Sequence, residues 1–436
     1  MVIGLGVSGM AATRFLLRKG ASVTASDQSV ECVSRPEVQA LEAQGANLVV
    51  GMDANTLFRD ADLVVISPGV PPMAELDALA RSGIPVVSEV ELASWYIKAP
   101  MVAVTGTNGK STVTTLVGQM CASLGNRVFV GGNLGTPAID VVDTEAAEAD
   151  GLVVLELSSF QLERIQTFRP KVAALLNVSP DHLDRYSSYQ AYRAAKARIF
   201  ENQTSHDVAV VPAGDPECVS LASESRARLC TFGDPDGEVR IVSGMLHDDV
   251  SGLTVPLNEI GIKSANNMSN AACSCLISRH VGVSPDAIRQ VLKEFRGLPH
   301  RMQFVSEIGR VQFYDDSKAT NVGAAVAALD GMGPTHERVV IIVGGKDKGG
   351  SYDPLVQRIK QRCRAVVLMG ETTPLLKAAL APTGVMLECV ESMQEAVQKA
   401  YSLAHPGDAV LLAPACSSYD MFQSYVHRGQ AFQAAV

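Results

Sequence analysis

The sequence predicts an α/β protein whose parallel sheets carry ligand-binding loops at the carboxyl ends of their strands. Short apolar segments alternate along the chain with amphipathic helical segments, which is the pattern of a parallel sheet covered by helices. Two glycine-rich turns, over 4–9 and 106–111, each stand between an apolar segment and a helical segment. Such strand–turn–helix units are typical of nucleotide-binding folds.

Length and charge place limits on the class of protein. A chain of 436 residues holds about three domains by the usual size of a domain. We expect an N-terminal Rossmann-like domain over 1–98, a central P-loop-type mononucleotide-binding domain over 99–297 and a C-terminal Rossmann-like domain over 298–436. The net charge of −9 and the lack of a basic block in the sequence argue against a nucleic-acid partner.

The cysteines and the apolar segments indicate the compartment. The nine cysteines are scattered, and only Cys273 and Cys275 lie close together, so we expect reduced thiols rather than a disulfide framework. No apolar run approaches the ~18 residues that a membrane span needs, and no signal peptide precedes the first glycine-rich turn. We therefore expect a soluble protein of the cytoplasm with no membrane insertion.

The N-terminal domain opens on the motif G-x-G-x-x-G, formed by Gly4, Gly6 and Gly9. A helical pattern and a second strand follow, and the strand ends at Asp27, an acid about 20 residues on, as in dinucleotide-binding turns. The motif alone is weak, because it fits NAD, FAD, UDP or no ligand. The turn S-P-G-V-P-P, which includes Gly69, either lines a ligand or is an ordinary loop.

The motif G-T-N-G-K-S, with its apolar strand before it and its helix after it, predicts a phosphate-binding loop. Gly106 and Gly109 let the backbone curl so that consecutive N–H groups face an anion, and the helix N-terminus adds partial positive charge. Lys110 can reach the β- and γ-phosphates of a nucleotide, and the hydroxyl of Ser111 can bind Mg²⁺. The usual spacing G-x-x-x-x-G-K-[ST] requires glycine at position 104, where this chain has Val104, so the loop is a shortened variant.

Two residues of the central domain stand at the ends of predicted strands. Glu156 ends the buried-type strand over 152–157, where a carboxylate is costly unless it is paired or bound to a metal. It either meets the Mg²⁺ of a nucleotide or caps the next turn. His182 follows the strand over 172–176 on the same expected rim of the sheet, which favours a metal or substrate role over a structural one.

A predicted helix over 188–200 places a lysine among apolar residues. Tyr192, Lys196, Ile199 and Phe200 share one helix face by their spacing. The composition favours a lysine that extends its ammonium group out to solvent. The alternative is a neutral lysine amine that takes up CO₂ to become a carbamate, an additional carboxylate for Mg²⁺.

Polar residues gather in four further segments. Asn267 and Asn270 lie one turn apart at the start of a predicted helix and either cap it or contact a base. In the C-terminal domain, D-D-S-K-A-T-N over 315–321, G-G-K-D-K-G-G over 344–350 and A-P-A-C-S-S-Y-D over 413–420 each follow an apolar strand. Each alone is an ordinary loop, but three such loops on one sheet edge indicate a ligand site.

With these motifs the chain resembles the ATP-dependent Mur ligase family along its whole length. The matching segments are G-L-G-V-S-G, S-P-G-V-P, T-G-T-N-G-K-S-T, G-G-N-L-G-T-P, L-E-L-S-S-F-Q-L, D-H-L-D-R-Y, Y-R-A-A-K, P-H-R, D-D-S-K-A-T-N, G-G-K-D-K and L-A-P-A-C-S-S-Y-D-M-F. The resemblance implies a UDP-binding N-terminal domain, a central ATPase domain and a C-terminal domain that closes for catalysis. It also implies the substrates UDP-N-acetylmuramoyl-L-alanine and D-glutamate, the cofactors ATP and two Mg²⁺ ions, and a monomer.

The resemblance assigns roles to individual residues of this chain. For the UDP-substrate it implies Gly4, Gly6, Ser8, Gly9, Asp27, Gly69 and Asn133. For ATP it implies Gly106, Thr107, Asn108, Gly109, Lys110, Ser111, Thr112, Asn267, Asn270, Arg301, Asp316 and Asn321. For D-glutamate it implies Thr320, Lys348, Ser418 and Tyr425. For Mg²⁺ it implies Ser111, Glu156, His182 and the carbamate of Lys196. The catalytic residues it implies are Lys110, His182, Lys196 and Lys318.

The chain departs from the family pattern at three of these places. Asn266 stands where the family often has histidine, Tyr425 where it often has phenylalanine, and Gln28 with Ser29 where it has an arginine near the uracil. Only Met1 to Ile3 precede the first glycine, so the first strand is short or the start codon is assigned late. None of these positions touches the phosphate chemistry.

The reaction that the resemblance implies activates a carboxylate. The γ-phosphoryl group of ATP passes to the carboxylate of the UDP-sugar to give an acyl phosphate, and the amine of D-glutamate attacks it through a tetrahedral intermediate. Both steps build negative charge, for which Lys110, Mg²⁺ and loop N–H groups supply countercharge. The rival hypotheses are a nicotinamide-dependent dehydrogenase, a non-catalytic nucleotide-binding scaffold and a related ligase with another amino-acid acceptor.

Overall fold

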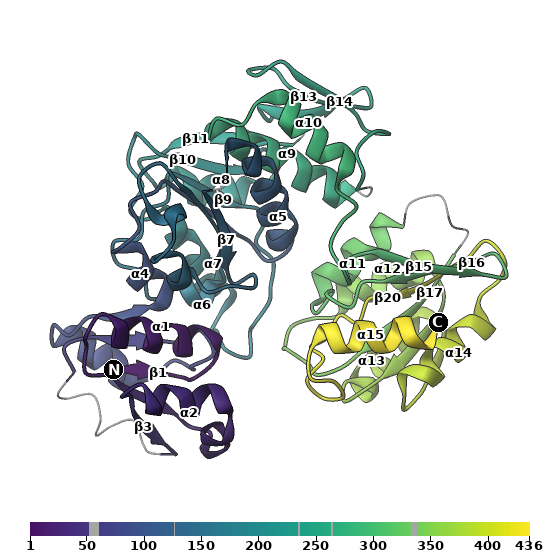
Figure 1. Ribbon diagram of the computed structural model, residues 1–436. Helices are drawn as coiled ribbons and strands as arrows, with labels where there is room; N and C mark the ends of the chain where they lie inside the picture. The colour runs from purple at the N-terminus through teal and green to yellow at the C-terminus, as the bar shows by residue number, and fades with distance from the viewer. Residues whose placement is uncertain (52–60, 126, 234–235, 263–264, 333–335, 337) are drawn as a thin grey trace. The chain divides into compact units, whose positions relative to one another are not determined.

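The computed structural model describes residues 1–51, 61–125, 127–233, 236–262, 265–332, 336 and 338–436. These residues form three sheets in two compact units. The first unit comprises 1–178, 190–257 and 270–291, and the second comprises 179–189, 258–269 and 292–436. Figure 1 labels many of the helices and strands of both units. The α/β fold class is as predicted, and the predicted domain boundaries stay a prediction.

The N-terminal sheet has five parallel strands in the order β3-β2-β1-β4-β5. Strand β1 lies between β2 and β4, so the strand order reverses at the strand that leads into the first glycine-rich turn. Its strands are β1 Val2–Ile3, β2 Thr24–Asp27, β3 Asn47–Val50, β4 Val64–Ile66 and β5 Val86–Ser88. Its helices are α1 Val7–Arg18, η1 Val30–Ser34, α2 Pro36–Ala43, α3 Ala74–Arg81 and α4 Glu89–Ser94.

The central sheet has nine strands in the order β14-β13-β12-β11-β10-β9-β6-β8-β7. Strand β6 lies between β9 and β8, so the phosphate-binding loop also follows a strand at which the order reverses. The strands are β6 Met101–Thr105, β7 Val128–Gly132, β8 Leu152–Glu156, β9 Val172–Leu175, β10 Val208–Pro212, β11 Arg228–Phe232, β12 Val239–Val242, β13 Met245–Asp248 and β14 Leu253–Pro256. The helices are α5 Lys110–Cys121, η3 Ala122–Leu124, η4 Ala138–Val141, η5 Glu145–Ala147, α6 Ser159–Leu162, α7 Tyr189–Ala197, η6 Arg198–Phe200, α8 Pro216–Ser223, α9 Ala265–His280 and α10 Pro285–Glu294.

The third sheet has six strands in the order β15-β16-β20-β17-β18-β19. Figure 1 shows helix α15 running along this sheet, where it contacts α14 and β16. The strands are β15 Gln303–Ile308, β16 Val311–Asp315, β17 Val339–Gly344, β18 Cys363–Met369, β19 Met386–Cys389 and β20 Ala409–Leu412. The helices are α11 Val322–Gly331, α12 Asp353–Arg362, α13 Thr373–Leu380, η8 Ala381–Thr383, α14 Met393–Leu403 and α15 Tyr425–Ala435.

Two antiparallel parts interrupt the predicted parallel pattern. Strands β12, β13 and β14 pair antiparallel at one edge of the central sheet, and β15 pairs antiparallel with β16. The turn between β12 and β13 uses Ser243 and Gly244, both with positive φ, which suits a two-residue hairpin. Strands β12, β13 and β14 have only four residues each. The alternation of apolar and polar residues was therefore too short to reveal them in the sequence.

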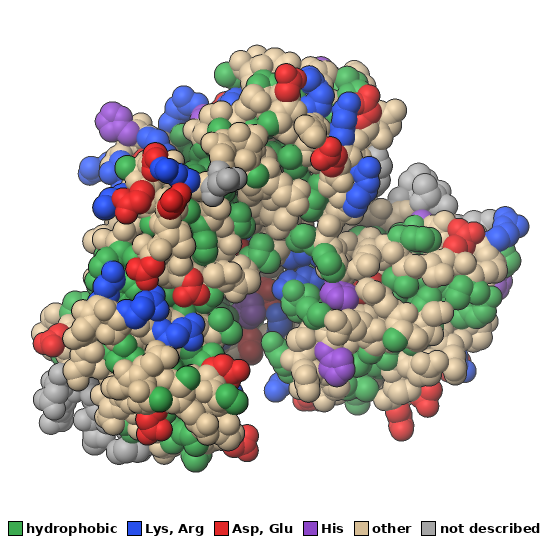
Figure 2. All heavy atoms as spheres, in the orientation of Figure 1, with side chains coloured by type: hydrophobic (Ala, Val, Ile, Leu, Met, Phe, Trp, Pro, Cys, Tyr) green, Lys and Arg blue, Asp and Glu red, His purple; other side chains and the backbone are tan. Residues whose placement is uncertain are grey.

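The N-terminal and central sheets of the first unit share one hydrophobic core. Its buried members include Phe15 and Val87 near the first sheet, and Val153 and Leu175 in the second. Because this apolar surface is continuous, the two sheets cannot separate without exposing it to water. Figure 2 shows acidic and basic side chains interspersed on the drawn face of the molecule, in keeping with a modest net charge.

A buried carboxylate adds a polar connection inside the first unit. Glu91 on α4 accepts hydrogen bonds from the backbone N–H groups of Gln166, Thr167 and Phe168, at 2.8–2.9 Å. Its carboxylate also accepts from Trp95 Nε1 at 2.8 Å. Burial alone raises the pKa of a carboxyl, but these hydrogen bonds outweigh it and hold the pKa of Glu91 below its usual value.

The cysteines and the helices can also be surveyed along the chain. All nine cysteines are free thiols, and eight of them are buried. Among the described residues, no helix combines the length and the apolar composition that crossing a bilayer requires.

We predict that Glu91→Gln lowers the free energy of unfolding of the first unit by about 2 kcal/mol at pH 7, because one charged acceptor of several N–H groups is lost. The pKa of Glu91 is lowered in the folded state, so its contribution is present above its ordinary pKa and is lost as the pH falls through the folded-state value. The difference between wild type and variant in urea unfolding should therefore shrink in acid. Glu42→Gln, at an exposed position of α2, is the control. Equal unfolding of Glu91→Gln and wild type at pH 7 would contradict this role.

Candidate active site

The phosphate-binding loop between β6 and α5 has the curled backbone that its glycines predict. Gly106 has φ +152° and Gly109 has φ +88°, and Gly109 is the N-cap of α5. Asn177, just past β9, holds the loop from the neighbouring strand. Its Oδ1 accepts from Asn108 N at 2.9 Å, and its backbone O accepts from Thr107 N at 3.0 Å. Sequence reasoning missed Asn177, although its place after a buried strand was a usable signal.

Two lysine ammonium groups converge on one carbonyl of this loop. The backbone O of Gly106 accepts from Lys110 Nζ at 2.7 Å and from Lys196 Nζ at 2.8 Å. Lys196 is only 2% exposed, and its Nζ lies 4.7 Å from the centre of the Tyr192 ring. The expectation that Lys196 extends its ammonium group to solvent is therefore wrong. Helix α7 instead aims this group at the phosphate-binding loop, because Tyr192 and Lys196 lie on its buried face.

A carboxylate at the end of β8 lies buried beside the next loop. Glu156 is 3% exposed, and its Oε1 accepts from Asn133 Nδ2 at 2.6 Å. Its Oε2 is buried and has no hydrogen-bond partner among the described residues. A buried carboxylate oxygen without a donor is costly, and a hard cation would satisfy it. The chemistry of this carboxylate thus fits a hard divalent cation such as Mg²⁺ at Glu156. Ser111 is buried in the first turn of α5, the helix that follows β6, and β6 is the neighbour of β8.

Asn270 lies against the phosphate-binding loop from α9. A Cβ atom added at Gly109 would lie 2.6 Å from Asn270 Oδ1, so only glycine leaves room for this amide. Asn267 stands one turn earlier on the same helix, as the spacing predicts. Residue Ser264, which began the predicted helix, lies outside the described residues, and α9 begins at Ala265.

The N-terminal glycine-rich turn is a tight strand-to-helix turn. Gly4 has φ +86°, and a Cβ at Gly9 would lie 1.8 Å from the backbone O of Gly4, so both positions require glycine. Two other residues predicted for this site lie on the neighbouring segments. Ser8 is in the first turn of α1, and Gly69 is in the exposed turn after β4. Helix α1 begins at Val7, so the helix N-terminus faces the same side as the carboxyl end of β1.

Asp27 closes this turn at the end of β2. Its Oδ2 accepts from Leu5 N at 2.7 Å and its Oδ1 from Ser29 N at 2.9 Å. Arg35 donates from Nη2 to the backbone O of Leu5 at 2.7 Å. Sequence reasoning noted that an arginine is missing directly after Asp27 but did not find Arg35, because the intervening η1 turn that brings it back is not visible in the sequence.

In the second unit, the segment that contains His182 meets two residues of the C-terminal sheet. Asp181 is 8% exposed, and its Oδ2 accepts from Asn321 Nδ2 at 3.0 Å. Its Oδ1 forms an ion pair with Lys348 Nζ at 3.5 Å. His182 has φ +55°, a left-handed conformation that is uncommon outside glycine and turns the chain sharply after Asp181. Sequence reasoning singled out His182 and missed Asp181.

The loop after β16 is anchored by a buried histidine. His300 Nδ1 lies 2.7 Å from Asp315 Oδ2, and Asp315 Oδ1 accepts from Ser317 N at 2.9 Å. The neighbouring Asp316 accepts from Met302 N at 3.3 Å. Burial raises the pKa of Asp316 to about 7, against the opposing effect of the Arg301 guanidinium. A carboxyl whose pKa is raised this far at a strand end is a marker of a functional site.

A buried arginine joins two of the three C-terminal loops. Arg428 on α15 is 2% exposed and donates to the backbone oxygens of Ser317, Cys416 and Ser417, at 2.9–3.3 Å. Its Nε also donates to Ser317 Oγ at 3.0 Å. Burial lowers the pKa of Arg428 to about 10, which leaves it charged at neutral pH. The loops over 315–321 and 413–420 are therefore held in one position by a single guanidinium group.

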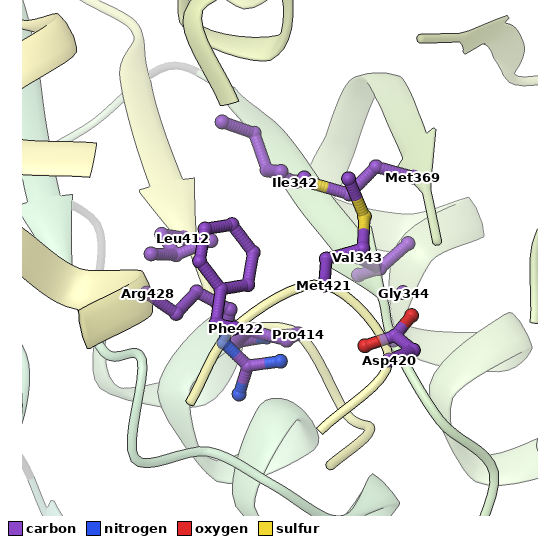
Figure 3. Close-up of a pocket in the computed structure, with 11 residues that line it drawn as sticks. Ile342, Val343, Gly344, Met369, Leu412, Pro414, Asp420, Met421, Phe422 and Arg428 are labelled. Carbon is purple, nitrogen blue, oxygen red and sulfur yellow. The ribbon is translucent and has the colours of Figure 1, made fainter. Parts of the chain in front are cut away.

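The same arginine borders a small cavity at the carboxyl ends of β17, β18 and β20. Its volume is about 10 Å³, close to the space that one water molecule needs. Figure 3 shows the side chains of Met421 and Phe422 over this cavity, with Arg428 at its edge. The segment after β20 is thus packed down on the sheet, which supports the neighbouring polar loop.

The remaining predicted residues of the C-terminal domain lie on these loops. Lys318 Nζ stands 3.8 Å from the centre of the Tyr425 ring, a close cation–π contact. Ser418 is buried, and its backbone O accepts from Phe422 N at 2.9 Å. Thr320 directly precedes Asn321, whose Oδ1 caps α11 by accepting from Ala324 N at 2.8 Å. The structure thus gathers these side chains at one edge of the third sheet.

Comparison with known proteins shows a match along the whole chain. Residues 1–88 match the Mur ligase MurD-like N-terminal domain, 104–277 the Mur ligase middle domain and 300–416 the Mur ligase glutamate ligase domain. The chain belongs to the Mur ligase family. The family resemblance predicted from the sequence motifs is therefore confirmed.

Relatives with this architecture include proteins named UDP-N-acetylmuramoylalanine–D-glutamate ligase. One from Desulfosudis oleivorans is 43% identical and one from Citrifermentans bemidjiense is 42% identical, with 100% of this chain and 95% and 96% of theirs covered. Among solved structures, the MurF ligase of Thermotoga maritima in complex with ADP has a TM-score of 0.64 at 16% identity, covering 100% of this chain and 97% of that one. MurC from the same organism has a TM-score of 0.61 at 19% identity, covering 99% and 97%. These structures show the Mur ligase fold.

We predict that Asp316→Asn makes the protein more stable than wild type at pH 8, by up to about 4 kcal/mol. Burial raises the pKa of Asp316 to about 7 in the folded state, so the folded protein holds this proton more tightly than the unfolded chain does. The free energy of unfolding of the wild type therefore falls as the pH rises from the ordinary pKa of an aspartate through 7. An asparagine does not ionise, so the melting temperature of the variant should fall less between pH 5.5 and pH 8.5. Glu391→Gln, at an exposed position, should follow the wild-type profile. Parallel pH profiles for wild type and Asp316→Asn would contradict this assignment.

Proposed function

We propose that this Mur ligase catalyses the ATP-dependent addition of D-glutamate to UDP-N-acetylmuramoyl-L-alanine, a step of peptidoglycan precursor synthesis. The observation that carries the proposal is the name shared by relatives that are 39–43% identical over 100% of this chain. The curled loop, the buried Glu156 and the C-terminal polar loops support it, because each places the chemistry that the reaction needs at a strand end. We further propose that the protein acts in the cytoplasm as a monomer.

The central residues handle the phosphates of ATP in this proposal. Lys110 leaves the Gly106 carbonyl to contact the β- and γ-phosphates, and the N–H groups at the start of α5 bind the same polyanion. Thr107, Asn108 and Thr112 complete the loop, while Asn267, Asn270, Arg301, Asp316 and Asn321 hold the rest of ATP. Mg²⁺ supplies charge neutralisation for phosphoryl transfer. We propose two Mg²⁺ ions, one held by Ser111 and Glu156 and the other by His182 and a carbamate on Lys196.

The contact between the two lysines supports the proposed carbamate. Lys110 and Lys196 donate to the same carbonyl, so two like charges share one acceptor in a place shielded from solvent. Carbamylation joins the Lys196 nitrogen to the carbon of CO₂. Starting from the ammonium form it releases two protons to solvent, so a positive charge is replaced by a negative one. The repulsion then becomes an attraction, and a new carboxylate lies beside the phosphate-binding loop.

The other substrates are proposed to occupy the two remaining sheets. The UDP diphosphate binds at the turn formed by Gly4, Gly6, Ser8 and Gly9, near Asp27 and Gly69, and Asn133 contacts the sugar-linked part. D-Glutamate is received by Thr320, Lys348, Ser418 and Tyr425, with Lys318 beside the reacting groups. The carboxylate of the UDP-substrate takes the γ-phosphoryl group to form an acyl phosphate. The amine of D-glutamate then adds to its carbonyl, and the tetrahedral intermediate expels phosphate.

A phosphate-release assay with a panel of D- and L-amino acids tests the proposed function. ATP, UDP-N-acetylmuramoyl-L-alanine and D-glutamate together should release phosphate, while L-glutamate and other amino acids should not. Turnover with a different amino acid would identify a related ligase instead. No phosphate release with any acceptor, together with a fluorescence change on adding NADH, would favour the dehydrogenase.

We predict that Lys110→Ala lowers the ligase turnover by roughly 10²–10³-fold, because one countercharge to the transferred phosphoryl group is removed. The melting temperature should stay close to that of wild type, since Lys110 is only partly buried. Lys98→Ala, at an exposed lysine that forms a surface ion pair, should leave turnover unchanged. Near-normal turnover of Lys110→Ala would refute the assignment of the phosphate-binding loop.

We predict that Lys196→Ala is almost inactive and regains turnover when short carboxylic acids such as formate or acetate are added. The added carboxylate fills the place of the carbamate beside the Gly106 carbonyl. Lys110→Ala is the matched control, because it removes the other lysine on the same carbonyl and should not respond to carboxylic acids. The carbamate is excluded if Lys196→Ala stays inactive at every carboxylate concentration while its fold is intact.

A further inference from the structure

A second group of metal-ligating side chains lies in the first unit, away from the phosphate-binding loop along the central sheet. Cys230 on β11, Glu238 just before β12 and His280 at the end of α9 bring a sulfur, a carboxylate oxygen and an imidazole nitrogen within 4.8 Å of one another. Nothing in the proposed ligase chemistry uses these three residues. We propose that they form a binding site for a thiophilic divalent cation, with Zn²⁺ as the best match.

The donor set decides the chemical class of the cation. Zn²⁺ binds Cys sulfur at about 2.3 Å and His nitrogen at about 2.0 Å, commonly with a carboxylate or water to complete a tetrahedron. Mg²⁺ prefers oxygen ligands and does not favour a sulfur. A ligand set of one thiol, one imidazole and one carboxylate therefore selects Zn²⁺ over the Mg²⁺ expected at Glu156.

The backbone holds two of the three ligands in place. Cys230 is 1% exposed in the interior of β11, and its neighbour Thr231 accepts a hydrogen bond from Glu238 N at 2.7 Å. His280 is the last residue of a sixteen-residue helix, so its position is set by the packing of α9. The three ligand atoms lie within 4.8 Å of one another, and a tetrahedral ion requires a spacing of about 3.5 Å. The Glu238 side chain is 30% exposed, which leaves it free to adjust.

The ligand atoms already face positively charged donors. Arg228 Nε donates to Cys230 Sγ at 3.4 Å, and Arg279 donates to Glu238 and, at 3.4 Å, to His280 Nε2. A bound cation would therefore compete with two guanidinium groups, that of Arg228 at Cys230 and that of Arg279 at Glu238 and His280. Arg228 is exposed and can turn to solvent, while Arg279 keeps its second partner, the buried Asp248. A cation can take over these lone pairs without leaving Arg279 unpaired.

The protonation states are compatible with metal binding. Burial and the nearby guanidinium groups lower the pKa of His280 to about 4, so its imidazole is neutral and its lone pair is available at neutral pH. Burial raises the pKa of the Cys230 thiol, so metal binding must release its proton to solvent. The bound state then combines one Zn²⁺ with one thiolate and one carboxylate, and the local charge is balanced.

A cavity next to His280 offers a path for the ion. It has a volume of about 570 Å³ and lies at the amino ends of β7 and β8, with His280, Val281 and Gly282 in its wall. This is the edge of the central sheet opposite the one that carries the phosphate-binding loop, since that loop follows the carboxyl end of β6. The proposed site is thus separate from the Mg²⁺ ligands.

Titration of the purified protein with Co²⁺ in excess Mg²⁺ tests the site, because Mg²⁺ saturates the oxygen-ligand sites. Wild type should develop a near-ultraviolet sulfur-to-cobalt charge-transfer band and tetrahedral visible bands at one equivalent, and Zn²⁺ should abolish both. Cys230→Ser should lose the charge-transfer band. Cys389→Ser, at the exposed cysteine, is the matched control and should keep it. A wild-type protein without the band, or a band that persists in Cys230→Ser, overturns the proposal.

Two further variants keep the test independent of the folding of Cys230→Ser. His280→Gln should weaken Zn²⁺ binding at least roughly tenfold, since loss of even an outer partner of a metal ligand typically costs that much. Arg228→Ala should tighten it, because the competing cation is removed. At the same Zn²⁺ concentration, the melting temperature should rise less for His280→Gln than for wild type and Arg228→Ala. Unchanged Zn²⁺ affinity in both variants overturns the proposal, and none of these measurements depends on ligase activity.

Discussion

The backbone oxygen of Gly106 is the point on which the central site depends. It receives the ammonium groups of Lys110 and Lys196, which come from two helices and would otherwise repel each other. The carbonyl can accept both because a carbonyl oxygen carries two lone pairs. Gly106 has a φ of +152°, which a residue with a side chain rarely adopts, so the loop conformation that presents this oxygen depends on glycine.

The same requirement, that a buried charge must find partners, organises the rest of the molecule. Glu91 collects backbone N–H groups and so connects the two sheets of the first unit through polar contacts as well as through the shared apolar core. Arg428 collects backbone oxygens and so fixes two loops of the third sheet. In each case one charged side chain satisfies several backbone groups of a loop and so fixes the position of that loop.

Glu156 and Asp316 show the opposite situation. Glu156 has a buried carboxylate oxygen with no donor among the described residues, and Asp316 is buried with a pKa raised to about 7. Both stand at the carboxyl ends of strands, where the proposed cation and nucleotide bind. Groups that are incompletely satisfied by the protein lower its stability, and they are retained where a ligand completes them.

Much of the fold could be predicted because its signals are local. The apolar strands, the glycine turns and the helices that follow both turns can be predicted from residues close together in the chain, although α1 begins at Val7 rather than near Met10. The antiparallel strands β12 to β14 could not, since four-residue strands give too little alternation to recognise. Arg35 and Asp181 were missed for another reason, because their hydrogen-bond partners are distant in the sequence.

The sequence by itself determined the family, the class of fold and the chemistry of the loops, because motifs such as G-T-N-G-K-S carry their geometry within a few residues. It did not determine the environment of a single side chain such as Lys196. Composition favoured solvent, but α7 packs that face inward and directs the ammonium group to Gly106. Only the tertiary structure decides such a case, because burial depends on which surfaces of distant segments meet, and the spacing along one helix does not specify its partner.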